Sequence, residues 1–189
     1  MSETSPNGTA SLDVAAWVEA AFDVMAEGGI DAVRVDPLAK RLGVTRGSFY
    51  WHFADRDALH LAMLKHWREG ASYLIYARVE RAADAKTPAE RLETLLSLPY
   101  SSPRSARAAA IELAVRLWAR RDKRAAKAVR HIDRVRLDYF QKLLMQHGLD
   151  KDEARKRAFL FYAALMAEAL IFTDNRDQTR VDLKHSLLG

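Results

Sequence analysis

Residues 38–59 read LAKRLGVTRGSFYWHFADRDAL, a pattern that predicts two short helices joined by a glycine turn and followed by the start of a third helix. Leu38, Ala39 and Leu42 give the first of these helices an apolar face at helical spacing. Gly43 follows, where glycine takes a left-handed cap without steric cost. Because Ala39 and Gly43 are small, a second helix can cross closely there. The pattern therefore predicts a helix-turn-helix.

The second helix of such a unit places its N-terminal residues against base edges. Arg46 is the strongest candidate for reading a base, because a guanidinium can bond a guanine edge in bidentate fashion. A phosphate contact or a free surface charge is the alternative. For Trp51 and His52, helix packing is the alternative to contact with the phosphate backbone. The candidate DNA-binding residues are Lys40, Thr45, Arg46, Gly47, Ser48, Tyr50, Trp51, His52 and Arg56.

The order and spacing of Gly43-Val44-Thr45, Phe49-Tyr50-Trp51-His52-Phe53 and Ala58-Leu59 resemble the DNA-binding signature of the TetR family of bacterial repressors. The resemblance covers residues 14–66, and beyond them only an all-helical pattern persists. It implies that Tyr50 and His52 stand at positions that usually touch phosphate. Asp36 and Pro37 depart from the basic or hydroxyl residues that some members use at the start of the second helix.

Composition and length fit a folded protein of one domain or two small ones. The chain has 189 residues, of which 49% are hydrophobic, and it has no cysteine. Disulfides, cysteine-ligated metals and thiol nucleophiles are therefore excluded, which suits a cytoplasmic location. Residues 1–11 lack the features of a secretory signal and are expected to be a disordered tail. The most apolar run, residues 158–172, is shorter than the roughly 20 residues needed to span a membrane.

The net charge of +5 does not by itself indicate nucleic-acid binding, because the charge is unevenly distributed. Residues 11–56 carry five basic and seven acidic side chains, whereas residues 40–56 carry four basic and one acidic. The positive charge of this region is thus local to the turn and the second helix. A larger excess lies further on, in the cluster Arg116, Arg120, Arg121, Lys123, Arg124 and Lys127. A solvated helix face is the simplest interpretation of this cluster, and attraction of an acidic ligand, DNA flanks or a membrane surface is the alternative.

We expect an all-α protein with an N-terminal three-helix DNA-binding domain at residues 12–56 and a C-terminal ligand-binding and dimerisation domain at residues 57–189. Asp36 is expected to cap the second helix, with Pro37 at its first position, and Asp55 or Asp57 to cap the fourth. The fourth helix runs through Trp67, with a break plausible at Gly70. A first helix is predicted at 12–27, before the helix-turn-helix. After the fourth helix, further helices are predicted at 87–96, 104–121, 122–147, 150–173 and 181–188, with a loop at 175–180.

The helix predicted at 153–173 is apolar nearly all round in its second half, so it must be buried on more than one face. With the helix at 122–147 it would form an antiparallel hairpin. The family resemblance implies that two such hairpins make a four-helix bundle in a homodimer. The alternative is that these residues fill the domain's own core. The candidate interface residues are Val135, Tyr139, Phe159, Phe161, Tyr162, Leu165, Met166 and Phe172.

The resemblance also implies an effector pocket in the C-terminal domain, lined by aromatic residues and a few polar groups. The candidates are Trp67, Tyr73, Tyr76, Ile111, Glu112, Val115, Trp118 and Tyr162, with core packing as the alternative for each. Glu112 and Glu168 are carboxylates within apolar stretches. A buried carboxylate needs a partner, either a nearby arginine or a cationic ligand.

The function implied is that of a ligand-responsive transcriptional regulator, a repressor that binds a palindromic operator as a homodimer and is released by an unknown small-molecule effector. The sequence contains no HExxH, GxxxxGK[ST] or GxSxG motif, so we expect no enzyme activity, no catalytic residue, no metal and no cofactor. The expected partners are double-stranded DNA, a second copy of the chain and the effector, without a membrane. A helical ligand-binding module without DNA activity is the competing hypothesis.

Overall fold

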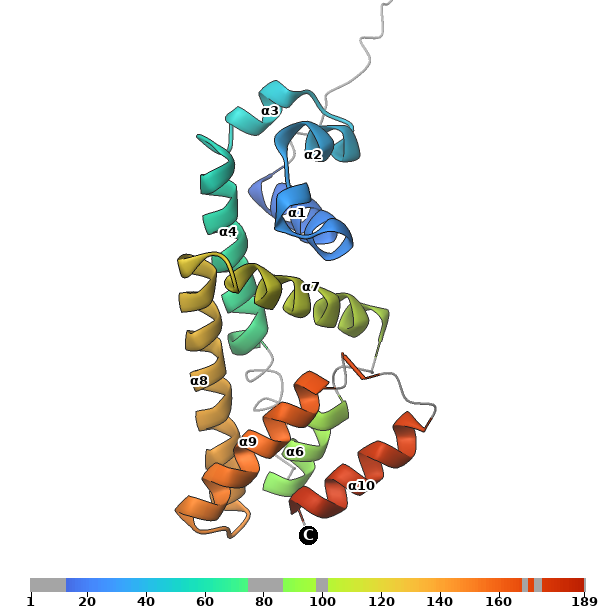
Figure 1. Cartoon of the computed structure of the whole chain (residues 1–189), viewed down its shortest axis with the longest axis vertical. Coiled ribbons are helices and arrows are strands. Elements are labelled where there is room, and N and C mark those ends of the chain that lie inside the picture. The colour runs from blue at the N-terminus through green and yellow to red at the C-terminus, as the bar shows by residue number, and fades with distance from the viewer. Residues whose placement is uncertain (1–12, 75–86, 98–101, 168–169, 172–174, 189) are drawn as a thin grey trace, which may run out of the picture. The chain divides into compact units, whose positions relative to one another are not determined.

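The computed structural model describes residues 13–74, 87–97, 102–167, 170–171 and 175–188. Every regular element in those ranges is a helix (Figure 1), which confirms the predicted all-α class. The chain forms two compact units, one ending at Met63 and the other beginning at Leu64. The division lies inside α4 (Arg56–Arg68), whereas the boundary predicted from the sequence lies at the start of that helix. The predicted tail, residues 1–11, is outside the described ranges.

The first unit consists of short helices around a small aromatic core. Its elements are α1 (Val14–Gly28), the 3-10 helix η1 (Ile30–Ala32), α2 (Val35–Leu42), α3 (Arg46–Tyr50) and the first part of α4. Trp17 of α1 and Phe49 of α3 are fully buried, and their rings meet edge to face with centroids 5.4 Å apart. Burying an apolar side chain of this kind contributes roughly 1.5–3 kcal/mol. Phe49 therefore anchors α3 on α1.

The turn between α2 and α3 contains the left-handed glycine that the sequence predicts. Gly43 has φ 68° and ψ 27°. Its N–H donates to the carbonyl of Lys40 at 3.2 Å, and the N–H of Val44 donates to the carbonyl of Ala39 at 3.0 Å. These bonds satisfy carbonyls that have no donor within the helix. Residues 43–45 alone connect the two helices, which fixes how α3 leaves α2.

The start of α2 differs from the sequence prediction. The helix begins at Val35 and its N-cap is Arg34, so Asp36 is not the cap. Pro37 is the third helical residue rather than the first. The first intrahelical hydrogen bond runs from the N–H of Leu38 to the carbonyl of Arg34, at 3.2 Å. A proline anywhere in the first turn is tolerated, because its missing N–H would have no helical partner there.

The second unit continues α4 and is built on capped helices. Its later elements are the π-helix η2 (Glu69–Leu74), α6 (Pro88–Ser97), α7 (Pro103–Ala119), α8 (Lys123–Gln146), α9 (Lys151–Ala167) and α10 (Arg176–Leu188). Thr87 and Glu90 form a capping box, with the N–H of Thr87 2.7 Å from Glu90 Oε2 and the N–H of Glu90 3.3 Å from Thr87 Oγ1. Asp122 and Asp150 accept hydrogen bonds from the first turns of α8 and α9. No helix in the described ranges is long and apolar enough to cross a membrane.

α8 and α9 form the predicted antiparallel hairpin and carry the core of the second unit (Figure 1). The chain reverses near Gly148, whose φ of 110° favours glycine. Phe140 and Leu143 of α8 pack in one cluster with Phe161 of α9 and Leu92 of α6. The rings of Phe140 and Phe161 lie 4.8 Å apart. One face of the hairpin is therefore used within a single copy of the chain.

Two helix boundaries near the C-terminus were wrongly predicted. α9 ends at Ala167, although the apolar pattern predicts a helix to residue 173. α10 begins at Arg176, although a loop was predicted over residues 175–180. Contacts distant in sequence hold α10: the Lys184 ammonium lies 2.8 Å from the Glu93 carboxylate, and Leu183 packs on the core cluster. The periodicity of a single segment cannot predict contacts with residues that are distant in the sequence.

Candidate functional site

α3 presents a polar face while its apolar side is fixed. Phe53, just after the helix, stacks on buried Phe49 with ring centroids 5.2 Å apart. On the outer side, Tyr50 is 50% exposed and Trp51 is 88% exposed. Because Trp51 is so exposed, the alternative that its side chain packs between helices is wrong, as far as the described part of the chain shows. We use the name recognition surface for the outer residues of α3 and its cap, which are Thr45, Arg46, Gly47, Ser48, Tyr50 and Trp51; all are exposed except Ser48, which is half-buried.

Two small residues at the start of α3 leave the backbone open. Thr45 is the N-cap residue of α3, but its hydroxyl makes no capping hydrogen bond, so the side chain is not committed to the helix. The N–H of Ser48 instead donates to the Thr45 carbonyl at 3.0 Å. A Cβ at Gly47 would lie 3.6 Å from Thr45 Oγ1, an ordinary van der Waals distance. The fold therefore does not require glycine at position 47.

The guanidinium of Arg46 is held in place by two neighbours. Its Nη2 donates to the hydroxyl of Tyr50 at 3.2 Å, and its Cζ lies 5.9 Å from the centre of the Tyr50 ring. Its Nη1 lies 3.7 Å from a carboxylate oxygen of Asp36. The hydrogen bond to Tyr50 and the charge of Asp36 raise the pKa of Arg46. Both members of the ion pair are mostly exposed, so the pair is weak and can yield to a stronger acceptor such as a base or a phosphate.

The remaining predicted DNA-contacting residues differ in how far the fold engages them. Lys40 is exposed on α2, and His52 is half-buried beyond the end of α3. Arg56 is also exposed, but its Nη2 donates to the carbonyl of Ile30 at 3.0 Å and its Nε points to His60 Nε2 at 3.3 Å. Arg56 thus joins α4 to η1. Its contact with phosphate stays a prediction that would have to coexist with this structural role.

A further cation near the turn is neutralised by the fold. Arg41 donates two hydrogen bonds of 2.8 Å to the carboxylate of Glu27. This hydrogen bonding lowers the pKa of Glu27 and raises that of Arg41. The positive charge offered around α3 therefore comes chiefly from Lys40 and Arg46.

The second unit contains a polar network that joins α7, α8, α9 and η2. It consists of Glu112 and Arg116 of α7, Asp133 and Arg136 of α8, and Tyr162 of α9. Arg136 donates from Nη1 and Nη2 to the two Glu112 oxygens at 3.0 and 3.1 Å, and from Nη2 to the carbonyl of Ala71 in η2 at 3.1 Å. Arg116 donates to Glu112 at 2.8 Å and to Asp133 at 2.6 Å. The Tyr162 hydroxyl donates to Asp133 at 2.6 Å and accepts from both arginines.

Burial and charge act in opposite directions in this network. Burial lowers the pKa of Arg136, but Glu112 and Tyr162 more than offset it, so the pKa is raised. Arg116 behaves in the same way, with Asp133 and Glu112 as its main compensating partners. Burial raises the pKa of Tyr162 to about 12, against the opposing effect of the two arginines. The network thus pairs two guanidinium groups with two carboxylates and one hydroxyl.

The residues predicted to line an effector pocket fall mostly in the core. Trp67, Ile111, Val115 and Trp118 are buried. Glu112 and Tyr162 belong to the polar network, so the arginine partner expected as the alternative for Glu112 is present. The Tyr73 side chain, Tyr76 and Glu168 lie outside the described residues.

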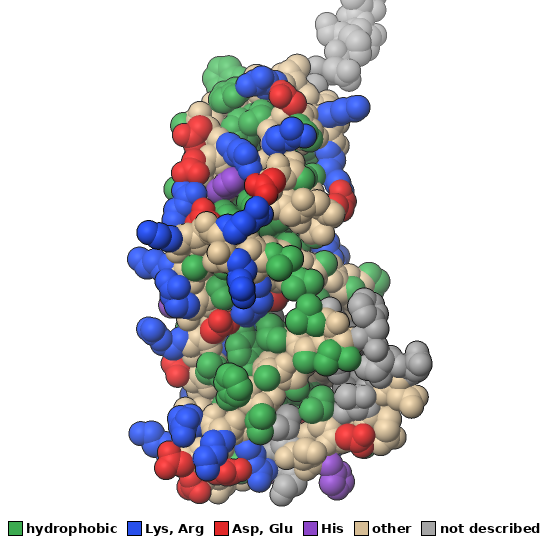
Figure 2. Space-filling view, viewed as in Figure 1, with side chains coloured by type: hydrophobic (Ala, Val, Ile, Leu, Met, Phe, Trp, Pro, Cys, Tyr) green, Lys and Arg blue, Asp and Glu red, His purple; other side chains and the backbone are tan. Residues whose placement is uncertain are grey.

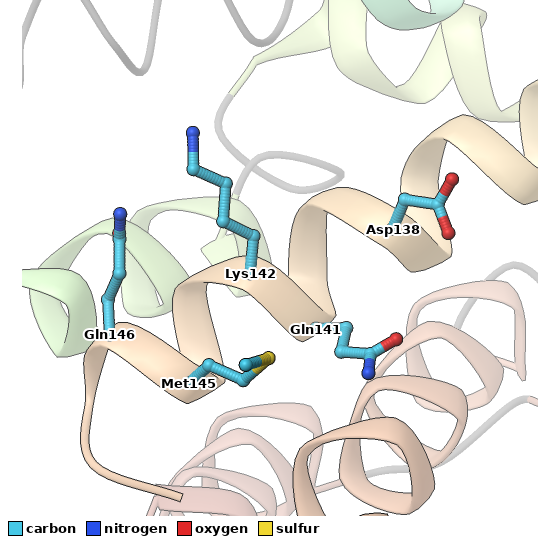
Figure 3. A pocket seen from close by; sticks show the side chains of 5 residues that line it. All are labelled: Asp138, Gln141, Lys142, Met145 and Gln146. Carbon is cyan, nitrogen blue, oxygen red and sulfur yellow. The ribbon is translucent and has the colours of Figure 1, made fainter. Parts of the chain in front are cut away.

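Two open depressions on the described surface lie elsewhere. One, of about 400 Å³, follows the second half of α8 and is lined by Asp138, Gln141, Lys142, Met145 and Gln146 (Figure 3). The other is lined by Glu90, Glu93, Thr94 and Ser97 of α6. Neither contains a residue predicted to contact the effector.

The residues predicted for a dimer interface divide into two groups. Phe161 is fully buried in its own chain and Tyr162 is 7% exposed, so neither offers area to a second copy. Val135, Tyr139, Leu165 and Met166 are half-buried, and the last three pack against the core cluster. Phe159, by contrast, is 63% exposed on the outer face of α9. Phe172 lies outside the described residues.

Three residues of interest were missed by sequence reasoning. Leu160 is 56% exposed beside Phe159, and hydrophobic side chains gather on the face over α9 (Figure 2). Leu160 lies in the helix that the sequence shows to be apolar nearly all round, but the sequence does not tell which side of that helix is exposed. Asp133 and Arg136 were missed because charged residues on an amphipathic helix are typical of its solvent side. Arg136 at least recurs at the spacing of buried Ile132 and Phe140.

The chain matches known proteins most clearly in its first unit. Residues 18–63 match a family model described as bacterial regulatory proteins, tetR family. Over 51 residues the chain is 43% identical to tetracycline repressor protein class A from transposon 1721 of Escherichia coli. This match covers 25% of the chain and 24% of the relative, so the chain spans about a quarter of the curated relative's length.

Solved structures share the fold over nearly the whole chain. A transcriptional regulator from Rhodococcus sp. Rha1 has a TM-score of 0.72 at 24% identity, covering 93% of this chain and 92% of that one. A regulator from Saccharomonospora viridis, solved in complex with choline, has a TM-score of 0.71 at 19% identity, covering 92% of each chain. At these identities the likeness shows the fold.

The fold and the recognition surface define a helix-turn-helix protein with a separate helical unit. The family match at residues 18–63 and the tetracycline repressor match agree that the first unit resembles the DNA-binding part of the tetR family of bacterial regulatory proteins, and the solved structures share the fold of the chain.

Proposed function

We propose that the chain is a ligand-responsive transcriptional repressor that binds a palindromic operator as a homodimer in the cytoplasm. Residues 12–56 act as its DNA-binding domain, and residues 57–189 bind the effector and the second copy. The observation that carries the proposal is the recognition surface, where Arg46 and its small neighbours stand exposed on a helix anchored by buried Phe49. The name of the Escherichia coli relative, a tetracycline repressor, supports the direction of regulation.

DNA contact is assigned to the residues predicted from the sequence. Arg46 reads a base edge after exchanging Asp36 for it, because the exposed ion pair costs little to break. Tyr50 and Trp51 lie along the phosphate backbone, and Lys40 adds charge beside them. Such contacts position the protein, whereas Arg46 supplies the sequence preference.

The homodimer is supported by the outer face of α9. Phe159 and Leu160 are both more than half exposed, in a helix whose other face is already buried. Adjacent exposed apolar side chains of this size are typical of protein interaction sites. A second copy would cover them, and two copies would present two recognition surfaces to half-sites about 34–36 Å apart.

Effector release is assigned to a shift between two conformations of the second unit. Arg136 connects the carbonyl of Ala71, in the π-helix that continues α4, to Glu112 of α7. An effector that binds best when this connection is rearranged would move the end of α4, the helix that also belongs to the first unit. The solved neighbour that holds choline supports a small molecule as effector, without identifying it here.

A gel-shift titration against the DNA upstream of the protein's own gene tests the proposal. We expect a specific complex that resists competitor DNA, and Arg46→Ala should weaken it roughly tenfold to hundredfold, since one bidentate base contact contributes about 1–3 kcal/mol. Lys142→Ala, which removes a charge from exposed α8, is the matched control and should bind normally. Binding that is indifferent to Arg46→Ala, or only weak and equal on every duplex, would favour a ligand-binding module without DNA activity.

A further inference from the structure

The excess of positive charge lies in the half of the chain that the recognition surface does not use. Residues 64–189 contain 25 lysines and arginines against 16 aspartates and glutamates. Much of this excess is concentrated at the end of α7 and in the first half of α8. Figure 2 shows Lys and Arg side chains along the edge of the view where this part of α8 runs.

The first half of α8 exposes cations and one histidine only. Between residues 123 and 134, the exposed residues are Lys123, Lys127, Arg130, His131 and Arg134. The four cations recur at intervals of four, three and four residues, which places them on one side of the helix. Arg120, exposed at the C-cap of α7, precedes them. We call Arg120, Lys123, Lys127, Arg130 and Arg134 the cationic row.

The acidic residues near the row either bind other groups or lie beyond its end. Asp122 accepts hydrogen bonds from the first turn of α8 and pairs with Arg124 at 3.1 Å. Asp133 belongs to the polar network. Asp138, the next exposed residue after Arg134, ends the row. No member of the row forms an ion pair with a residue that the structure describes.

We propose that the cationic row is a second contact surface for duplex DNA, one that binds phosphates without regard to base sequence. Its helical part, from Lys123 to Arg134, extends over about 16 Å at 1.5 Å per residue. Duplex DNA carries one negative charge per about 1.7 Å of its axis, so the row meets several phosphates at once. The proposal rests on the proposed function only in its choice of DNA as the polyanion.

Other occupants fit the row less well. A membrane surface recruits helices that show large apolar side chains beside their cations, and no exposed residue between 123 and 134 is apolar. Single-stranded nucleic acid is held by aromatic stacking, which this segment also lacks. A second copy of the same row would be repelled, because like charges would face each other across a two-fold axis.

The test is the salt dependence of binding to a duplex that lacks any palindrome. Full-length protein is titrated onto a labelled 30-base-pair duplex at several salt concentrations, and the slope of log K against log salt is measured. The test variant is K123Q/K127Q/R130Q/R134Q. If all four cations contact phosphate, the slope should fall in magnitude by about 3–4, since each contact contributes about 0.9.

Two controls separate the row from net charge and from folding. K142Q/K151Q/R155Q/K156Q removes the same charge from exposed positions outside the row and should leave the slope within about one unit of the wild type. K123R/K127R/R130K/R134K keeps the charges and should keep the slope. Equal slopes for the two glutamine variants would overturn the proposal. A row variant that loses binding to phosphatidylserine vesicles but keeps its DNA slope would overturn it in favour of a membrane surface.

The result does not depend on operator recognition. Arg46→Ala should leave the contribution of the row on the non-palindromic duplex intact. A row effect without operator discrimination would contradict the proposed repressor function and support the DNA surface. Operator discrimination without a row effect would support the proposed repressor function and contradict the DNA surface.

Discussion

At the scale of single residues, Gly47 is a position where the fold does not require glycine, whereas contact with DNA would. A Cβ at this position meets only Thr45 Oγ1, at an ordinary distance, and an alanine in a helix is favoured over glycine by roughly 0.5–1 kcal/mol. The first unit therefore leaves room for an alanine at this position. We infer that glycine serves close approach of the α3 backbone to DNA.

The first prediction concerns Gly47→Ala. The free energy of unfolding should stay the same or rise by roughly 0.5–1 kcal/mol. Operator affinity should fall about tenfold or more, equivalent to at least about 1.4 kcal/mol, because the new methyl group would stand between the backbone and the DNA. Urea unfolding and anisotropy titration of the same sample measure the two effects. Unchanged operator affinity would assign Gly47 no role at the interface.

Single residues of the recognition surface were predictable because their chemistry is local. Arg46 and Tyr50 follow the glycine turn at fixed positions, so their exposure follows from the burial of Phe49 between them. The engagement of Arg56 by the Ile30 carbonyl was not predictable, since the two residues are far apart in the sequence. The same is true of Asp36 beside Arg46, which joins two helices across the turn.

At the scale of elements, the polar network explains how four segments of the second unit are held together. A buried ion pair is expensive to form, and it is tolerated here because every charged member has oppositely charged or hydroxyl partners. Removing one member leaves the others unsatisfied in the interior. We expect such a loss to cost about 1–3 kcal/mol for each unsatisfied group.

The second prediction uses Tyr162→Phe to measure this network as a function of pH. In the folded chain the pKa of Tyr162 is raised to about 12, above its ordinary value of 10.0. The stabilisation linked to its proton is complete below pH 10 and is lost as the pH rises through about 12, because only the unfolded chain ionises in between. The stability difference between the wild type and Tyr162→Phe should therefore shrink by about 2–3 kcal/mol over that window. Urea unfolding from pH 7 to 11.5 covers about 2 kcal/mol of this change, and a constant difference would contradict the buried position of the hydroxyl.

Helices were predictable from the sequence where their ends are marked by local chemistry. Thr87, Asp122 and Asp150 accept hydrogen bonds from the first turns of their helices, and Gly43 and Gly148 follow the ends of theirs. Boundaries without such a marker were missed. The helix α9 ends at Ala167 although the apolar pattern of the sequence runs on, and α10 begins among polar residues because its packing is supplied by Leu183 and the Lys184–Glu93 pair.

At the scale of the whole molecule, the exposed apolar face of α9 is the surface that a second copy would bury. The hairpin of α8 and α9 buries Phe161 internally but leaves Phe159 and Leu160 outside. The sequence alone could not say which side of the apolar helix faces a second copy, because both sides carry large side chains. The burial of each residue in a single copy favours the side of Phe159 and Leu160.

The third prediction is that Phe159→Arg abolishes the homodimer. Light scattering of the wild type should give about twice the monomer mass of 21.4 kDa, and the variant should give the monomer mass. A charge buried without a partner in an apolar interface is strongly unfavourable. Leu117→Arg, a change at a 62% exposed position on α7, is the matched control and should remain dimeric. A dimer that survives Phe159→Arg would place the interface elsewhere.

The most direct measurement of the central claim is selection of bound sequences from a pool of random duplexes by the full-length protein. We expect enrichment of an inverted repeat whose half-sites are centred about 10–10.5 base pairs apart, or a multiple of that distance, as two recognition helices in successive major grooves require. Phe159→Arg should enrich at most a single half-site, and Arg46→Ala should lose preference at one base pair in each half-site. Recovery of sequences without any common motif would contradict the assignment of the chain as an operator-binding regulator.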